Sequence, residues 1–104
     1  IGSDQLKQMK PGALLINVAR GDIVDPNALT AALQSGHLGG AALDVFNPEP
    51  IPTGHPILSM SNVIVASHVA SVSGPAVHKL RETVALQAAM ALRGERMPNI
   101  VNGL

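Results

Sequence analysis

The chain has 104 residues, is 46% hydrophobic and 13% charged, and balances seven basic against seven acidic residues. That length predicts one domain at most. The zero net charge lacks the excess of positive charge that is typical of proteins that bind nucleic acid or an anionic membrane. Cysteine is absent, which excludes a disulfide framework and a thiolate metal site. The composition favours a cytoplasmic protein, and the low charge indicates that much of its surface contacts a ligand, a subunit or another domain.

The N-terminal part predicts a short helix followed by a buried strand. Ser3 or Asp4 is a suitable cap for a helix that runs to about Met9, and the Pro-Gly pair at 11–12 then turns the chain. Residues 13–18 form an almost unbroken apolar run. Continuous apolarity is typical of a strand covered on both faces, as in a parallel sheet.

The middle of the chain predicts a helix, a strand and a loop. Asp25 caps a helix with proline at its first position, and Gly36 is well placed to end it. Residues 41–46 predict a second strand. Three prolines within 47–52 forbid regular pairing and predict a loop.

The C-terminal part predicts a third strand at 62–66 and a long helix over 74–92, with an extended tail at 97–102. Strands separated by crossovers indicate an α/β fold with a parallel sheet. Three strands make a poor parallel sheet on their own. The order strand-helix-strand-strand-helix therefore predicts half of a doubly wound, Rossmann-type sheet.

Polar groups follow each of the three predicted strands. Arg20 comes after the first, the stretch 44–49 contains Asp44 and Glu49, and His68 follows the third. Because ligands of open parallel sheets bind beyond the carboxyl ends of the strands, these groups are the candidate functional residues.

Each candidate also has a structural interpretation. Arg20 could form a weak surface ion pair with a nearby aspartate, and Glu49 could simply be solvated. Asp44 inside an apolar strand could cap a neighbouring helix, since a carboxylate there is costly unless it is paired. His68 could be a partly buried histidine with satisfied hydrogen bonds. The remaining histidines are interpreted as structural or solvated: His37, His55 and His78.

Several motifs occur in order along the chain. They are KPGALLINVARG at 10–21, IVD at 23–25, GHLGGAALDVF at 36–46, Glu49-Pro50, and SHVAS at 67–71. Together they resemble the late signature of the D-isomer-specific 2-hydroxyacid dehydrogenases over nearly the whole chain. One departure is Ser67, where many members carry proline before the histidine.

The resemblance implies roles for the candidate residues. It assigns Arg20 to substrate binding, His68 to acid/base catalysis and Glu49 to pairing with that histidine, while Asp44 would hold the nicotinamide carboxamide. Arginine suits a two-pronged carboxylate contact, and histidine exchanges protons near neutral pH. No metal site is implied. The implied cofactor-contacting residues are Val18, Ala19, Arg20, Asp44, His68, Val69, Ala70 and Ser71.

The resemblance also implies partners and a domain plan. It implies NAD or NADP, with NAD favoured, a small 2-hydroxy or 2-oxo acid substrate and a homodimer. Residues 1–94 would be the C-terminal half of an NAD-binding domain, and 95–104 a tail returning toward a substrate domain. The sequence has no Gly-x-Gly-x-x-Gly turn for pyrophosphate. We therefore expect a fragment of a larger two-domain chain, inactive when isolated.

Alternative functions stay open from sequence. A non-enzymatic NAD(H)-sensing module of the co-repressor type can keep the same residues, and phosphite oxidation on this scaffold is compatible with them. Formate enzymes carry glutamine where Glu49 stands, which argues against formate. Glycerate-type acids, glyoxylate or hydroxypyruvate, and bulkier 2-oxo acids all remain candidate substrates.

Overall fold

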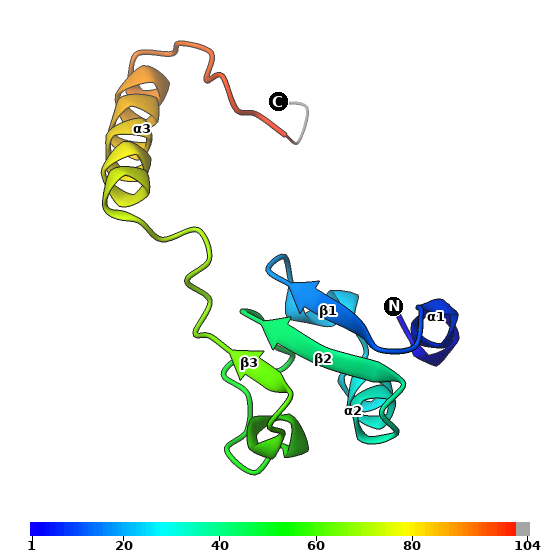
Figure 1. The fold of residues 1–104 in the computed structure, drawn as a ribbon. Helices are drawn as coiled ribbons and strands as arrows, with labels where there is room; N and C mark the ends of the chain where they lie inside the picture. Colours follow the sequence, from blue (N-terminus) through cyan, green and yellow to red (C-terminus); the bar gives the residue numbers. More distant parts are fainter. Residues whose placement is uncertain (102–104) are drawn as a thin grey trace. The chain divides into compact units, whose positions relative to one another are not determined.

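The computed structural model describes residues 1–101 and has the expected α/β fold, with additional short elements (Figure 1). Its helices and strands are α1 (Ser3–Gln8), β1 (Ala13–Asn17), α2 (Pro26–Gln34), β2 (Leu38–Leu43), β3 (Val63–Val65) and α3 (Gly74–Leu92). The sequence did not predict two 3-10 turns, at Gly21–Ile23 and Pro56–Ser59. Among the described residues, none of the helices is long and apolar enough to cross a bilayer.

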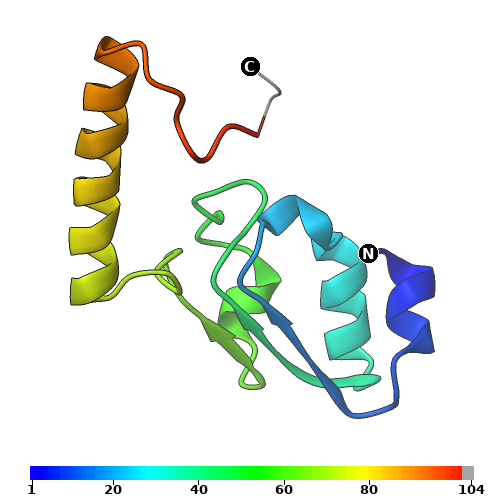
Figure 2. The same ribbon diagram turned by 90° about the horizontal axis from the view of Figure 1, so that it is seen from above.

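The sheet is three-stranded and parallel, in the order β1-β2-β3, as the sequence predicted. Because all three strands run the same way, their carboxyl ends lie at one edge. The loops after Asn17, Leu43 and Val65 therefore leave the sheet on the same side. Figures 1 and 2 show α2 beside the sheet and α1 beside α2.

The predicted bounds of β2 were wrong. The strand begins at Leu38, three residues earlier than expected, and ends at Leu43, so Asp44 follows the strand instead of lying within it. The reason is the close approach of neighbouring backbones. A Cβ on Gly39 would lie 2.5 Å from the Gly12 carbonyl oxygen, and one on Gly40 would lie 2.6 Å from that of Asn62. Glycine thus permits pairing here instead of breaking the strand.

The expected cap of α1 was also wrong. The helix begins at Ser3, so Gly2 is the N-cap residue, and the Gln5 Oε1 atom accepts a hydrogen bond of 2.8 Å from the Gly2 N–H. The cap of α2 is confirmed, because the Asp25 carboxylate accepts from the N–H groups of Asn27 and Ala28.

Within residues 1–70, one face of the sheet is buried and the other is left uncovered. Leu15, Ala41 and Leu43 pack in a core with residues of α1 and α2. On the opposite face, Ile16 and Ile64 are 69% and 73% exposed. Residues 1–70 thus cover one face of the first strand, and the expectation that both faces are covered stays a prediction. Successive side chains of a strand point to opposite faces, and α1 and α2 cover only one of them.

The chain divides into two compact units, residues 1–70 and the residues from Ser71 onward. In the second unit, the Ser73 hydroxyl caps α3 by accepting from the Ala76 N–H, and Gly94 ends it with a φ of +71°. The domain boundary expected at residue 94 stays a prediction. Residues 95–101 form neither helix nor strand, and the end of the predicted tail, 102–104, lies outside the described residues.

Candidate functional site

The loop after β1 carries Arg20 and is shaped by a buried asparagine. Asn17 is 7% exposed, its Nδ2 atom donates to the Arg20 carbonyl at 2.9 Å, and its Oδ1 atom accepts from the Ala19 N–H at 3.1 Å. The Asn17 carbonyl also accepts from the N–H of Asp44. Asn17 therefore joins two of the three loops. Sequence reasoning missed this role, although an asparagine within an apolar run was a visible signal.

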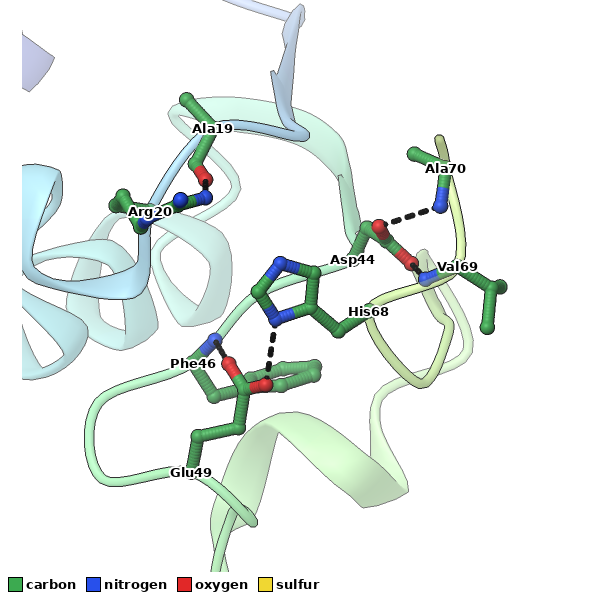
Figure 3. Close-up of polar contacts among 8 residues, drawn as sticks. All are labelled: Ala19, Arg20, Asp44, Phe46, Glu49, His68, Val69 and Ala70. Carbon is green, nitrogen blue, oxygen red and sulfur yellow. Dashed lines mark hydrogen bonds and ion pairs between the residues drawn. The ribbon is translucent and has the colours of Figure 1, made fainter. Parts of the chain in front are cut away.

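Arg20 is exposed, and its side chain folds back on its own loop. The Nη1 atom donates to the Ala19 carbonyl at 2.7 Å (Figure 3). Within residues 1–101, no ion pair joins it to Asp22 or Asp25. Within the part of the chain that the structure describes, the Arg20 side chain forms no hydrogen bond to His68 and none to Glu49. Its remaining guanidinium donors are available to an anion.

Gly21 holds the Arg20 loop against the loop after β2. A Cβ built on Gly21 would lie 2.0 Å from the carbonyl carbon and oxygen of Phe46. Only a glycine fits at that separation. The contact brings the backbone next to Arg20 against the segment that leads to Glu49.

Glu49 and His68 form a direct pair. The Nδ1 atom of His68 lies 2.7 Å from Oε1 of Glu49, with side chains 42% and 40% exposed, and Oε2 accepts from the Phe46 N–H at 3.2 Å (Figure 3). The hydrogen bond from His68, followed by that from the Phe46 N–H, lowers the pKa of Glu49. Because an ionised carboxylate only accepts, the proton sits on Nδ1 and the neutral ring presents Nε2 as a base.

The backbone at His68 is left-handed, and the residues that follow it bind Asp44. His68 has a φ of +59°, a conformation that costs a non-glycine residue roughly 1–2 kcal/mol. The N–H groups of Val69 and Ala70 donate to Oδ1 and Oδ2 of Asp44, each at 2.8 Å. These two hydrogen bonds are the main cause of the lowered pKa of Asp44.

A cavity of about 690 Å³ lies beside the Glu49–His68 pair. Its wall is mostly apolar, and its lining residues are Phe46, Glu49, Pro50, Ile51, Leu58, Val65, Ala66, Ser67 and His68. Nowhere in residues 1–101 do three His, Cys, Asp or Glu side chains gather as a metal site.

The structure brings the predicted residues together unequally. Glu49 contacts His68, and Asp44 contacts Val69 and Ala70, the two residues that follow His68. Arg20 lies on a separate loop. Val18 and Val69 are 60% and 45% exposed. Of the predicted cofactor-contacting residues, Ser71 alone belongs to the second unit.

The other histidines are placed as interpreted from sequence. His37 bonds through Nε2 to the Leu6 carbonyl at 3.1 Å, and His55 caps a 3-10 turn through Nδ1. His78 pairs with Glu82 on the exposed surface of α3. None of these three histidines forms a hydrogen bond or ion pair with Asp44, Glu49 or His68 among the described residues.

The fold and the loop contacts agree with a known family. The family model described as "D-isomer specific 2-hydroxyacid dehydrogenase, NAD binding domain" matches residues 1–70. The chain belongs to this family. The matched segment is the unit that holds the sheet and the Asp44, Glu49 and His68 contacts, so the resemblance seen in the sequence is confirmed.

Members of the D-isomer specific 2-hydroxyacid dehydrogenases resemble the chain from end to end. A glyoxylate reductase of Korarchaeum cryptofilum is 46% identical over 98% of this chain, which spans 31% of that protein. A family enzyme of Xanthobacter autotrophicus, solved with NADPH and MES, is 41% identical with a TM-score of 0.82, covering 96% of this chain and 40% of that one. An NAD-complexed enzyme of Lactobacillus delbrueckii is 34% identical with a TM-score of 0.83, and the match covers 98% of this chain and 35% of that one.

Proposed function

We propose that this chain supplies the acid/base and carboxylate-binding residues of an NAD(P)-dependent D-2-hydroxyacid dehydrogenase that reduces a small 2-oxo acid. The single observation that carries the proposal is the 2.7 Å contact between His68 and Glu49 beside the cavity. It leaves Nε2 of His68 as the proton-exchanging atom. Similarity to a glyoxylate reductase supports glyoxylate as a first candidate substrate, and similarity to glyoxylate/hydroxypyruvate reductases supports hydroxypyruvate next.

His68 exchanges the proton of this reaction. Reduction of a 2-oxo acid adds a hydride to C2 and a proton to the carbonyl oxygen. The imidazolium of His68 donates that proton from Nε2, and in the reverse direction the neutral ring accepts it. Glu49 keeps Nδ1 protonated, orients the ring and stabilises its positive charge.

Arg20 holds the substrate carboxylate. A guanidinium offers parallel N–H donors that match the two oxygens of a carboxylate, a geometry that lysine lacks. The exposed position of Arg20, with one donor on the Ala19 carbonyl, leaves such a pair available. Arg20→Lys is therefore expected to raise the KM for the oxo acid.

The residues present fit the nicotinamide end of a cofactor, which supplies or takes the hydride when bound. An ionised carboxylate has about four lone-pair sites, and the Asp44 carboxylate uses two on Val69 and Ala70. It therefore retains acceptors for a carboxamide N–H. The exposed Val18 offers apolar surface for a ring, together with Ala19. Relatives solved with NADPH and with NAD support either cofactor, and we propose NAD.

The wider proposals concern the setting of this site. We propose a cytoplasmic homodimer, supported by the absence of cysteine and the low charge content. Residues 1–94 would form the C-terminal half of the NAD-binding domain, with 95–104 returning toward a substrate domain.

The test is a turnover assay on the protein that carries this chain. NADH and NADPH oxidation would be followed with glyoxylate, hydroxypyruvate and pyruvate, and cofactor binding would be measured separately. The proposal predicts turnover of at least one oxo acid. Tight cofactor binding without turnover of any acid would instead support an NAD(H)-sensing module, and oxidation of phosphite alone would move the assignment to phosphite.

A further inference from the structure

Asp44 sits just past β2 and makes two contacts to a segment far along the chain. It is 5% exposed, and its two carboxylate oxygens accept from the backbone N–H groups of Val69 and Ala70, both at 2.8 Å. These donors are the first two N–H groups after His68. No other side chain of the described residues bonds to these two N–H groups.

The backbone at His68 explains why those donors converge. Its φ of +59° places the residue in the left-handed region, and successive N–H groups around such a residue form a concavity that binds anions. The Asp44 carboxylate fills this concavity. The conformation is unfavourable for histidine, so its persistence requires an external restraint, which the two hydrogen bonds provide.

Glu49 restrains a different part of His68. It contacts the Nδ1 atom of the ring from the proline-rich loop and is 40% exposed. That contact selects a ring orientation but does not act on the backbone. Asp44 hydrogen-bonds to the backbone after His68 and not to the ring, although its charge also interacts with the imidazole. The hydrogen bonds of the two carboxylates therefore act on different parts of this segment.

We propose that Asp44 is a positioning residue for His68. The Asp44 carboxylate holds the left-handed backbone of His68, and this backbone aims the His68 Nε2 atom at the substrate oxygen. This inference rests on the proposed function, in which His68 is the acid/base. It is separate from any contact between Asp44 and the nicotinamide carboxamide. A cofactor contact does not depend on His68, whereas a positioning effect vanishes when the imidazole is gone.

A double-mutant cycle separates these two roles. Asp44→Asn keeps the shape but replaces one acceptor oxygen with an amino group that cannot accept from an N–H. In the protein carrying this chain, assayed with glyoxylate, the substitution is expected to lower kcat by about 100-fold, the cost of a misplaced catalytic group. In a His68→Ala background the same substitution is expected to change kcat by less than about twofold.

A structural readout accompanies the kinetics. Amide hydrogen exchange at Val69 and Ala70 is expected to accelerate in Asp44→Asn. Asp25→Asn is the matched control, because Asp25 also accepts two backbone N–H groups but caps α2. It is expected to leave kcat and the exchange of Val69 and Ala70 unchanged.

Three results would overturn the inference. The first is a full Asp44→Asn effect that persists in His68→Ala, which would assign Asp44 to the cofactor. The second is wild-type kcat in folded Asp44→Asn, and the third is unchanged amide exchange. If Asp44→Asn does not fold, Ala70→Pro removes one donor, keeps the carboxylate and enters the same cycle with the same expectations. A His68→Ala protein with wild-type kcat would instead contradict the proposed function itself.

Discussion

Glu49 accepts hydrogen bonds from two sides of the site, from the His68 ring and from the Phe46 backbone. Both favour the ionised carboxylate, and they lower its pKa from the usual 4.5. A carboxylate that stays charged as pH falls can stabilise an imidazolium throughout the range in which histidine exchanges protons.

This charge predicts a pH-dependent stability difference. Because the folded pKa of Glu49 is lowered, its contribution to the free energy of unfolding is present above pH 4.5 and is lost as pH falls through the folded value. The gap in unfolding free energy between wild type and Glu49→Gln should be largest near neutral pH and should shrink below pH 4.5. Denaturant titrations at several pH values measure it.

The control for this titration is Glu82→Gln. Glu82 pairs with His78 on the surface of α3, where the side chains are 67% and 77% exposed. An exposed pair contributes less than about 1 kcal/mol. If the difference in unfolding free energy between wild type and Glu49→Gln stays constant from neutral to acid pH, the pairing of Glu49 with His68 does not stabilise the fold as argued.

At the same scale, the sequence predicted some site residues and not others. Arg20 and His68 were found because each follows a predicted strand, and Asp44 because a carboxylate inside an apolar run is costly unless it is paired. Asn17 was missed because its importance lies in contacts to Arg20 and Asp44 that depend on how the loops meet. The roles inferred for these residues stay predictions.

At the scale of elements, the site depends on how closely two loops approach each other. The parallel strands deliver the loops to one edge, and Gly21 then lies directly against the Phe46 backbone. That contact sets the separation between the segment bearing Arg20 and the one bearing Glu49. Under the proposed function, Arg20 on one segment would hold the substrate carboxylate, and Glu49 on the other would orient the His68 ring.

Gly21→Ala tests this loop contact. Its Cβ would lie 2.0 Å from the Phe46 carbonyl group, so the loops must separate. We expect a loss of about 1–3 kcal/mol in unfolding free energy, together with a lower kcat/KM. Gly54→Ala is the matched control, because nothing lies within 4 Å of a Cβ there, and it should stay within about 0.5 kcal/mol. Equal stability of the two variants would show that the loops do not touch.

The bounds of β2 show where sequence reasoning at this scale fails. Glycine usually weakens a strand, and the predicted strand over 41–46 left out Gly39 and Gly40. Their actual role is to let the backbones of Gly12 and Asn62 approach, which only the paired structure reveals. The cap of α2 was predictable because Asp25 bonds to residues two and three positions away.

At the scale of the molecule, residues 1–70 cover one face of the sheet that they contain. The apolar run of β1 predicted parallel strands correctly, but a run that is apolar throughout does not show which face the chain itself covers. Ile16 and Ile64 remain exposed, while Leu15 is buried. The chain spans about a third of the relatives it matches, so substrate choice and subunit arrangement remain proposals.

The central claim is that His68 exchanges the proton, and His68→Ala in the protein carrying this chain tests it most directly. The kcat for glyoxylate reduction, measured across pH on folded protein, should fall by about 100-fold or more. His37→Ala, the same change at a histidine bonded to the Leu6 carbonyl, should keep wild-type kcat. A His68→Ala protein that turns over glyoxylate at the wild-type rate at every pH would contradict the account.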